Sequence, residues 1–212
     1  MLAVSTMSVL NSIAFFQKRL DEVPNKELAK TLAETENKAG ITEIVANLKH
    51  KNRNVQSDCL GVLYHIGYVK PNLIADYVED FLSLLQSKNN RLVWGAMIAL
   101  STIAEIKPVE ICAKLDILKQ AIDNGTLITV VWGVKTLAKV VGSNKTCKSD
   151  IEPILLSQLK NCIPRDVAMH FESSLPAIND ENKSLFLAVV EDRKKEMTPA
   201  QLARLKKAMK NL

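Results

Sequence analysis

Residues 92–104 read LVWGAMIALSTIA, and this stretch decides the fold. Its apolar residues recur four, seven, eight and eleven places after Leu92, a spacing that puts them on one side of an α-helix. The same spacing begins again at Val55, Val130 and Val167, so consecutive starts lie 37, 38 and 37 residues apart. A helical phrase with a period near 40 residues predicts a repeat fold, in which each unit buries its apolar side against the next.

A second apolar-periodic stretch precedes each phrase, so each repeat is expected to contain two antiparallel helices joined by a turn. Pro71 and Pro108 each follow a lysine, and proline is tolerated in the first turn of a helix but not inside one. These prolines therefore mark places where a new repeat begins. The first helices are expected over residues 41–49, 73–85, 109–122 and 151–159, with turns at 51–54, 87–90, 123–126 and 161–165.

Both ends of the chain predict further helix pairs of weaker periodicity. Residues 7–20 and 25–37 are expected to form the first pair. At the other end, Asp180 is expected to cap a helix that continues to about Lys195. Residues 198–201 read TPAQ, which is the start signal of a final helix with a capping box.

The phrase-bearing stretches resemble the second helix of the HEAT-repeat family. That helix carries valine, arginine, two variable residues, two alanines, a variable residue and then alanine-leucine, and the similarity spans about residues 41–178. One departure follows the first apolar residue, where HEAT units usually place arginine and this chain has Gln56, Val93, Val131 and Ala168. We therefore expect an all-α, right-handed superhelical solenoid of about six antiparallel helix pairs.

The expected organisation is a single domain over residues 1–212. It would comprise an N-terminal helix pair (1–40), four HEAT-like repeats (41–178) and a basic C-terminal capping pair (179–212). The positive formal charge of +5 comes from this last part, because the chain from residue 193 onward contains seven basic residues and one acidic residue, Glu196. The basic residues are Arg193, Lys194, Lys195, Arg204, Lys206, Lys207 and Lys210.

Two interpretations of these basic residues stay open. They are either the polar outer side that a terminal repeat needs, or contacts for the phosphates of a nucleic acid. The second interpretation makes the chain a nucleic-acid-binding HEAT-like protein, which we keep as the alternative function.

The main functional prediction concerns the concave surface, which the second helices line in HEAT proteins. On the side opposite the buried stripe, Trp94 and Trp132 hold the same place in adjacent repeats. Each is followed by a glycine that would leave the surface beside the indole open. Aromatic residues on a side that should be polar mark an interaction site, here for a partner peptide or helix. The predicted contacts are Tyr64, Tyr68, Trp94, Ile98, Trp132 and Met169. The alternative is that both indoles pack on a neighbouring repeat as buried spacers.

The sequence offers little for chemistry. Three histidines occur singly, without a second ligand at metal-binding spacing, and no Gly-rich phosphate loop or nucleophile elbow is present. Concave tryptophans also occur in the HEAT-like alkylpurine DNA glycosylases, but the expected groove is poor in the cations that hold DNA phosphates. We therefore expect a non-enzymatic interaction scaffold without cofactor or metal.

The remaining predictions concern the compartment. The four cysteines are far apart and form no CxxC motif, which favours a reduced, cytoplasmic protein. The first 16 residues are apolar but interrupted by polar residues and lack a preceding basic residue, so we expect no cleaved leader. No stretch has the roughly 18 uninterrupted apolar residues of a membrane span.

Overall fold

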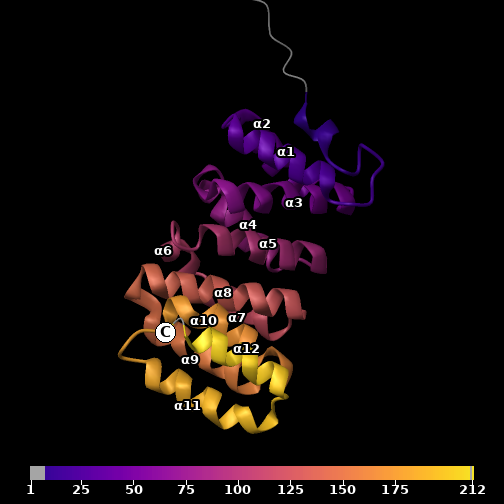
Figure 1. The fold of residues 1–212 in the computed structure, drawn as a ribbon. Coiled ribbons are helices and arrows are strands. Elements are labelled where there is room, and N and C mark those ends of the chain that lie inside the picture. The colour runs from indigo at the N-terminus through magenta and orange to yellow at the C-terminus, as the bar shows by residue number, and fades with distance from the viewer. Residues whose placement is uncertain (1–7, 211) are drawn as a thin grey trace, which may run out of the picture. The chain divides into compact units, whose positions relative to one another are not determined.

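The computed structural model describes residues 8–210 and 212. Within those residues the chain forms twelve α-helices joined by short 3-10 turns, and no β-strand. Figure 1 shows this all-helical arrangement. The chain divides into two compact units, residues 1–106 and residues 107–212, and each is described by itself. The predicted organisation as one domain stays a prediction.

The first unit consists of helix pairs in chain order. Helices α1, α3 and α5 pack side by side, and Figure 1 shows them as successive layers. Helix α2 packs on α3, and α4 packs on α5. The bounds are α1 (Val23–Glu34), α2 (Lys38–Ala46), α3 (Arg53–Val69), α4 (Val78–Leu84) and α5 (Asn90–Ile103), with 3-10 turns at Val9–Ser12, Asn47–Lys49, Pro71–Leu73 and Ala75–Tyr77.

The second unit repeats this plan. Helix α8 packs on α10, and α10 packs on α12, while α7 packs on α8, α9 packs on α8 and α10, and α11 packs on α9 and α10. The bounds are α6 (Pro108–Cys112), α7 (Leu115–Asp123), α8 (Leu127–Ser143), α9 (Lys148–Asn161), α10 (Val167–Ser174), α11 (Lys183–Arg193) and α12 (Pro199–Met209). The 3-10 turns are Lys145–Cys147, Pro164–Asp166, Leu175–Ala177 and Lys194–Glu196.

The repeated phrase forms the buried side of α3 and α5, as the spacing predicts, whereas Val130 of α8 is half-buried and the last two residues of the fourth phrase, Leu175 and Ile178, lie beyond α10 and are half-buried. All five phrase residues of α3 are buried, and so are all five of α5. Each of these helices is preceded by an N-cap asparagine, Asn52 or Asn89, whose side-chain oxygen accepts a hydrogen bond from the backbone N–H two residues later. Pro71 and Pro108 open the next helical segments, so their predicted place is also confirmed.

Several boundaries differ from the prediction. The helix expected over 73–85 begins as two 3-10 turns, and the one expected over 109–122 is divided into α6 and α7. Helix α10 ends at Ser174 and continues only as a 3-10 turn, because Pro176 has no N–H for an α-helical hydrogen bond. At the C-terminus, the capping box between Thr198 and Gln201 is confirmed. The Asp180 cap is wrong, since α11 begins at Lys183.

The helix expected over 7–20 is also wrong. Among its described residues, only Val9–Ser12 forms a 3-10 turn, and Met7 lies outside the described residues, as does the first part of the stretch considered for a leader. Lys18 has a positive φ of 55°, which ends any helical course. Two backbone N–H groups of this segment donate to side chains of α1 and α3 instead of to helix carbonyls. Tertiary hydrogen bonds therefore override the local helical pattern.

The cysteines also depart from expectation. Cys112 and Cys147 in the second unit form a disulfide whose Cα atoms are 6.4 Å apart, while Cys59 and Cys162 are free. The disulfide joins cysteines that are 35 residues, or about one repeat, apart, so no short sequence motif predicts this pairing. A cytoplasmic location stays a prediction. No helix among the described residues combines the length and apolar character needed to cross a bilayer.

Candidate functional site: a hollow in the first unit

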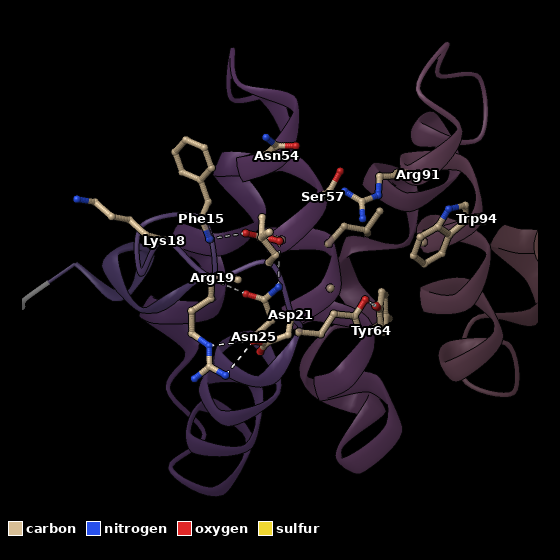
Figure 2. Close-up of a pocket in the computed structure, with 17 residues that line it drawn as sticks. Phe15, Lys18, Arg19, Asp21, Asn25, Asn54, Ser57, Tyr64, Arg91 and Trp94 are labelled. Atoms are coloured by element: carbon tan, nitrogen blue, oxygen red, sulfur yellow. Dashed lines mark hydrogen bonds and ion pairs between the residues drawn. The ribbon is translucent and has the colours of Figure 1, made fainter.

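A hollow of about 350 Å³ lies in the first unit, between residues 14–22, α3 and α5. Figure 2 shows its lining. Helix α3 contributes Ser57, Gly61 and Tyr64, of which Tyr64 is one of the predicted contact residues. Helix α5 contributes Trp94, which is half-buried, so this indole is neither sealed in the core nor fully exposed.

One wall of the hollow is the segment that precedes α1, and two polar side chains hold it. The Ala14 N–H donates to Asn25 Oδ1 at 2.9 Å, and the Phe15 N–H donates to Asp58 Oδ2 at 2.7 Å. The Asn25 amide also donates to Asp58 Oδ1 at 3.1 Å, which joins α1 to α3. Asn25 is 2% exposed, so these hydrogen bonds satisfy polar groups that would otherwise be costly to bury.

The opposite side of the hollow is aromatic. The Tyr64 and Trp94 ring centroids are 6.4 Å apart. The Tyr64 hydroxyl donates to Glu22 Oε1 at 3.2 Å, which fixes the ring against the wall segment. Burial, and secondarily the Glu22 carboxylate, raise the pKa of Tyr64 well above its ordinary value, so its hydroxyl stays a donor.

Next to this pair stand two further rings of α3. The Tyr68 ring centroid is 6.1 Å from that of Tyr64 and 5.8 Å from that of His65, and Tyr68 is 50% exposed. His65 Nε2 lies 3.5 Å from Glu22 Oε2. Burial lowers the pKa of His65, although Glu22 opposes this effect, so the imidazole is mainly neutral at pH 7.

Gly95 has a different role from the predicted one. A Cβ at this position would lie 2.7 Å from the Leu60 Cδ2 atom of α3. The glycine therefore lets α3 and α5 approach closely, in addition to bordering the hollow beside Trp94.

The predicted contact residues separate into three groups. Tyr64 and Trp94 meet at the hollow, and Tyr68 lies one turn further along α3. Ile98 and Tyr64 are each 6% exposed, but Ile98 does not line the hollow, so its prediction as a surface contact is wrong. Ser101, one turn further, is also buried, and a helix inside a stack is covered on more than one side.

Trp132 and Met169 belong to the second unit, on α8 and α10, and both are half-buried. The Lys135 ammonium lies 4.2 Å from the Trp132 ring centroid, which is a cation–π contact. Burial is the main cause that lowers the pKa of Lys135. The indole of this unit is thus covered by a lysine from its own helix.

The predicted phosphate contacts differ strongly in their surroundings. Arg193 is 6% exposed, and its guanidinium donates to the backbone carbonyls of Leu159, Lys160 and Cys162 at the end of α9. This arginine completes the fold, which corrects its prediction as a surface contact. Three other basic residues form ion pairs: Lys194 with Glu191, Lys195 with Asp192 and Arg204 with Glu172. Lys206, Lys207 and Lys210 are exposed on or just after α12.

The sequence analysis missed Asn25, Asp58, Arg91 and the wall segment. Asp58 lies directly before the buried Cys59, and an acid beside a buried stripe is a signal that a donor must face it. Nothing in the repeat pattern indicates that the donor comes from 43 residues earlier. Among the described residues, no group of three or more His, Cys, Asp or Glu side chains is arranged to hold a metal ion.

Comparison with known proteins identifies the fold. No protein-family model matches the sequence, and no curated protein matches it. Among solved structures, an engineered protein has a TM-score of 0.62 at 18% identity, with 97% of this chain and 96% of that chain covered. A designed armadillo repeat protein in complex with the peptide (KR)4 has a TM-score of 0.64 at 14% identity, with 88% and 86% covered.

A third structure comes from computationally designed armadillo repeat proteins for modular peptide recognition, with a TM-score of 0.62, 14% identity and the same coverage. Identities this low establish the fold alone. The chain is therefore an all-α repeat protein with the armadillo and HEAT type of fold.

Proposed function

We propose that the chain is a non-enzymatic scaffold that binds a peptide segment of a protein partner, and that the hollow of the first unit is the docking site. The observation that carries the proposal is Trp94, a half-buried indole beside a hollow of about 350 Å³ with a polar rim. This volume lies within the range of ligand sites. The likeness to armadillo proteins designed for peptide recognition supports the proposal.

The energetics favour an anchor residue at this place. Tryptophan and tyrosine are enriched among the residues that dominate binding energy, and burial of one large apolar side chain contributes about 2 kcal/mol. Tyr64 is 6% exposed and is already held by Glu22 at 3.2 Å, so it forms a fixed floor beside Trp94 that needs little further ordering when a ligand binds. Tyr68 extends the aromatic surface beyond the hollow.

We propose Trp132 and Met169 as a second, weaker contact surface of the other unit. Because Lys135 lies over the Trp132 ring, a ligand must displace a cation–π contact before it reaches the indole. The proposal involves no cofactor, and release of a base from alkylated DNA would contradict its non-enzymatic part.

The composition of the chain allows a direct test, because Trp94 and Trp132 are its two tryptophans. In the variant Trp132→Phe, indole fluorescence reports on Trp94 alone. Peptides selected from a random display library against the intact protein should change this emission in a saturable titration. If the selected peptides bind without changing the Trp94 emission, the hollow is not the docking site.

The alternative function concerns the C-terminal end. Lys206 and Lys207 on α12 and Lys210 just after it are exposed, whereas the other predicted phosphate contacts are engaged in the fold or in ion pairs. Retention on a DNA or RNA column at low salt would support this alternative only if the triple substitution of these lysines by glutamine abolishes it. Equal retention of the triple variant contradicts it.

A further inference from the structure

Building on the proposed docking site, we infer the chemistry of its ligand: an acidic peptide. A large apolar side chain of the peptide packs against Trp94 in the hollow, and an aspartate or glutamate two residues away pairs with Arg91. This inference depends on which polar groups around the hollow are already in use.

The carboxylates around the hollow have their partners within the protein. Asp21 accepts from the Arg19 guanidinium at 2.8 Å and from the Val23 N–H at 2.9 Å. Asp58 and Glu22 accept from the wall segment and from Tyr64, as described above. A ligand cation would have to compete with these bonds for the same oxygens.

The cationic donors are different. Arg91 is exposed on α5, and no hydrogen bond or ion pair of its guanidinium is found within residues 8–210. The same holds, over those residues, for the ammonium of Lys18 on the wall segment. Figure 2 shows the Arg91 side chain on the same side of α5 as Trp94. The hollow thus offers unused donors and few unused acceptors.

Net charge alone does not select the ligand, because the lining contains three acidic and three basic side chains. The ligand is selected instead by the hydrogen-bonding capacity of the unused donors. A guanidinium presents five N–H donors in a planar fork, and a carboxylate accepts two of them in a charge-assisted pair. A lysine or arginine in the ligand would instead face Arg91 at close range, with like charges in a partly buried place.

The spacing between Arg91 and Trp94 defines the peptide further. Residues three apart on a helix have their Cβ atoms about 5–6 Å apart. In an extended peptide, side chains on the same side are two residues, or about 6.6 Å, apart. An extended ligand therefore fits best with one residue between its apolar and its acidic side chain.

The test uses the full chain with the substitution Trp132→Phe and three blocked nonapeptides. Each peptide has phenylalanine at its centre and the same residue two positions away on both sides: glutamate, glutamine or lysine. Phenylalanine does not interfere with indole emission, so Trp94 reports binding directly. We expect the glutamate peptide to bind on the order of tenfold more tightly than the glutamine peptide, and more tightly still than the lysine peptide.

Variants assign the effect to Arg91. In Arg91→Gln, the glutamate and glutamine peptides should bind equally, whereas Arg53→Gln, an exposed arginine at the start of α3 outside the hollow, should keep the preference. If the protein that retains Arg91 binds the lysine or glutamine peptide as tightly as the glutamate peptide, or more tightly, the acidic preference is overturned but the docking site is not. No emission change with any peptide overturns both.

Discussion

Trp94 and Trp132 stand in the same tripeptide, Val-Trp-Gly, at the same place in the repeat phrase, yet their surroundings differ. Trp94 borders a hollow closed on one side by residues 14–22. Trp132 lies under the ammonium of Lys135. One turn after each indole the first unit has Met97, which is buried, and the second unit has this lysine.

The difference shows what a repeat pattern controls. The period places an indole on a given side of a helix, because that depends on residues within the same helix. What covers the indole depends on the residue one turn away and on segments outside the repeat. Two identical tripeptides can therefore have different surroundings, and the comparison can be tested at several points.

The largest effect on peptide binding is expected from replacing each of the two tryptophans by alanine. Trp94→Ala should weaken the binding of a selected peptide by about 2–3 kcal/mol, since it removes the central anchor. Trp132→Ala should cost less than about 0.5 kcal/mol, because a lysine already covers that ring. Isothermal titration calorimetry measures both affinities. Equal losses would contradict the distinction between the two sites.

A smaller effect is expected from releasing the wall. Asp58→Ala removes the acceptor of the Phe15 N–H and of the Asn25 amide, which should lower the free energy of unfolding by about 1–2 kcal/mol. Hydrogen exchange of the Ala14 and Phe15 amides should accelerate, and peptide affinity should fall. Asp116→Ala, at an exposed site on α7, is the matched control and should change none of these three quantities. Unchanged exchange in the Asp58 variant would show that the wall is held otherwise.

The histidines provide a comparison by pH. Burial lowers the pKa of His65 in the first unit and of His170 in the second. The unfolded chain therefore takes up a proton first, near pH 6.5, and folding stability falls as the pH decreases from there toward the lowered folded pKa.

His170 should show the larger effect, because it is 2% exposed and its Nδ1 atom has no hydrogen-bond partner among the residues that the structure describes. Between pH 7.5 and 5.5, His170→Gln should reduce the decrease in melting temperature by roughly 2–4 °C, and His65→Gln by less. Differential scanning calorimetry at both pH values tests this order, and a larger effect at His65 would reverse it.

The smallest effect concerns the cover of the second indole. In a chain that retains only Trp132 through Trp94→Phe, the further substitution Lys135→Met should increase quenching of the indole by acrylamide. Stability should change by less than about 1 kcal/mol, the range of a cation–π contact. If quenching stays the same, Lys135 does not shield the ring, and the two indoles are more alike than the structure indicates.

The fold could be predicted from the sequence wherever the determining residues lie close together. The phrase beginning at Leu92 and the capping box at Thr198 depend on neighbours within one or three turns, and both are confirmed. The course of residues 7–20 depends on Asn25 and Asp58, which the local pattern cannot connect to it. Charge was similarly misleading at Arg193, which binds carbonyls of a helix end more than 30 residues earlier.

Only part of the candidate site could be predicted from the sequence, because the rest depends on residues far apart in the chain. Tyr64 and Trp94 follow from helical counting, and the structure brings their rings within 6.4 Å. Ile98 follows from the same counting but is buried, because counting identifies the side of a helix and not what packs there. Arg91 was passed over, since an exposed arginine in a first helical turn has no distinguishing pattern.

The wall formed by residues 14–22 has a consequence for engineering. In a modular binder, each repeat carries its own specificity and can be moved, duplicated or reordered. A graft of α3 and α5 into another scaffold would transfer Tyr64 and Trp94. It would not transfer the backbone segment that hydrogen bonds to Asn25 and Asp58 hold beside them. Under the proposed function, recognition in this hollow would depend on residues 14–22 together with α3 and α5, so these segments should be transferred together.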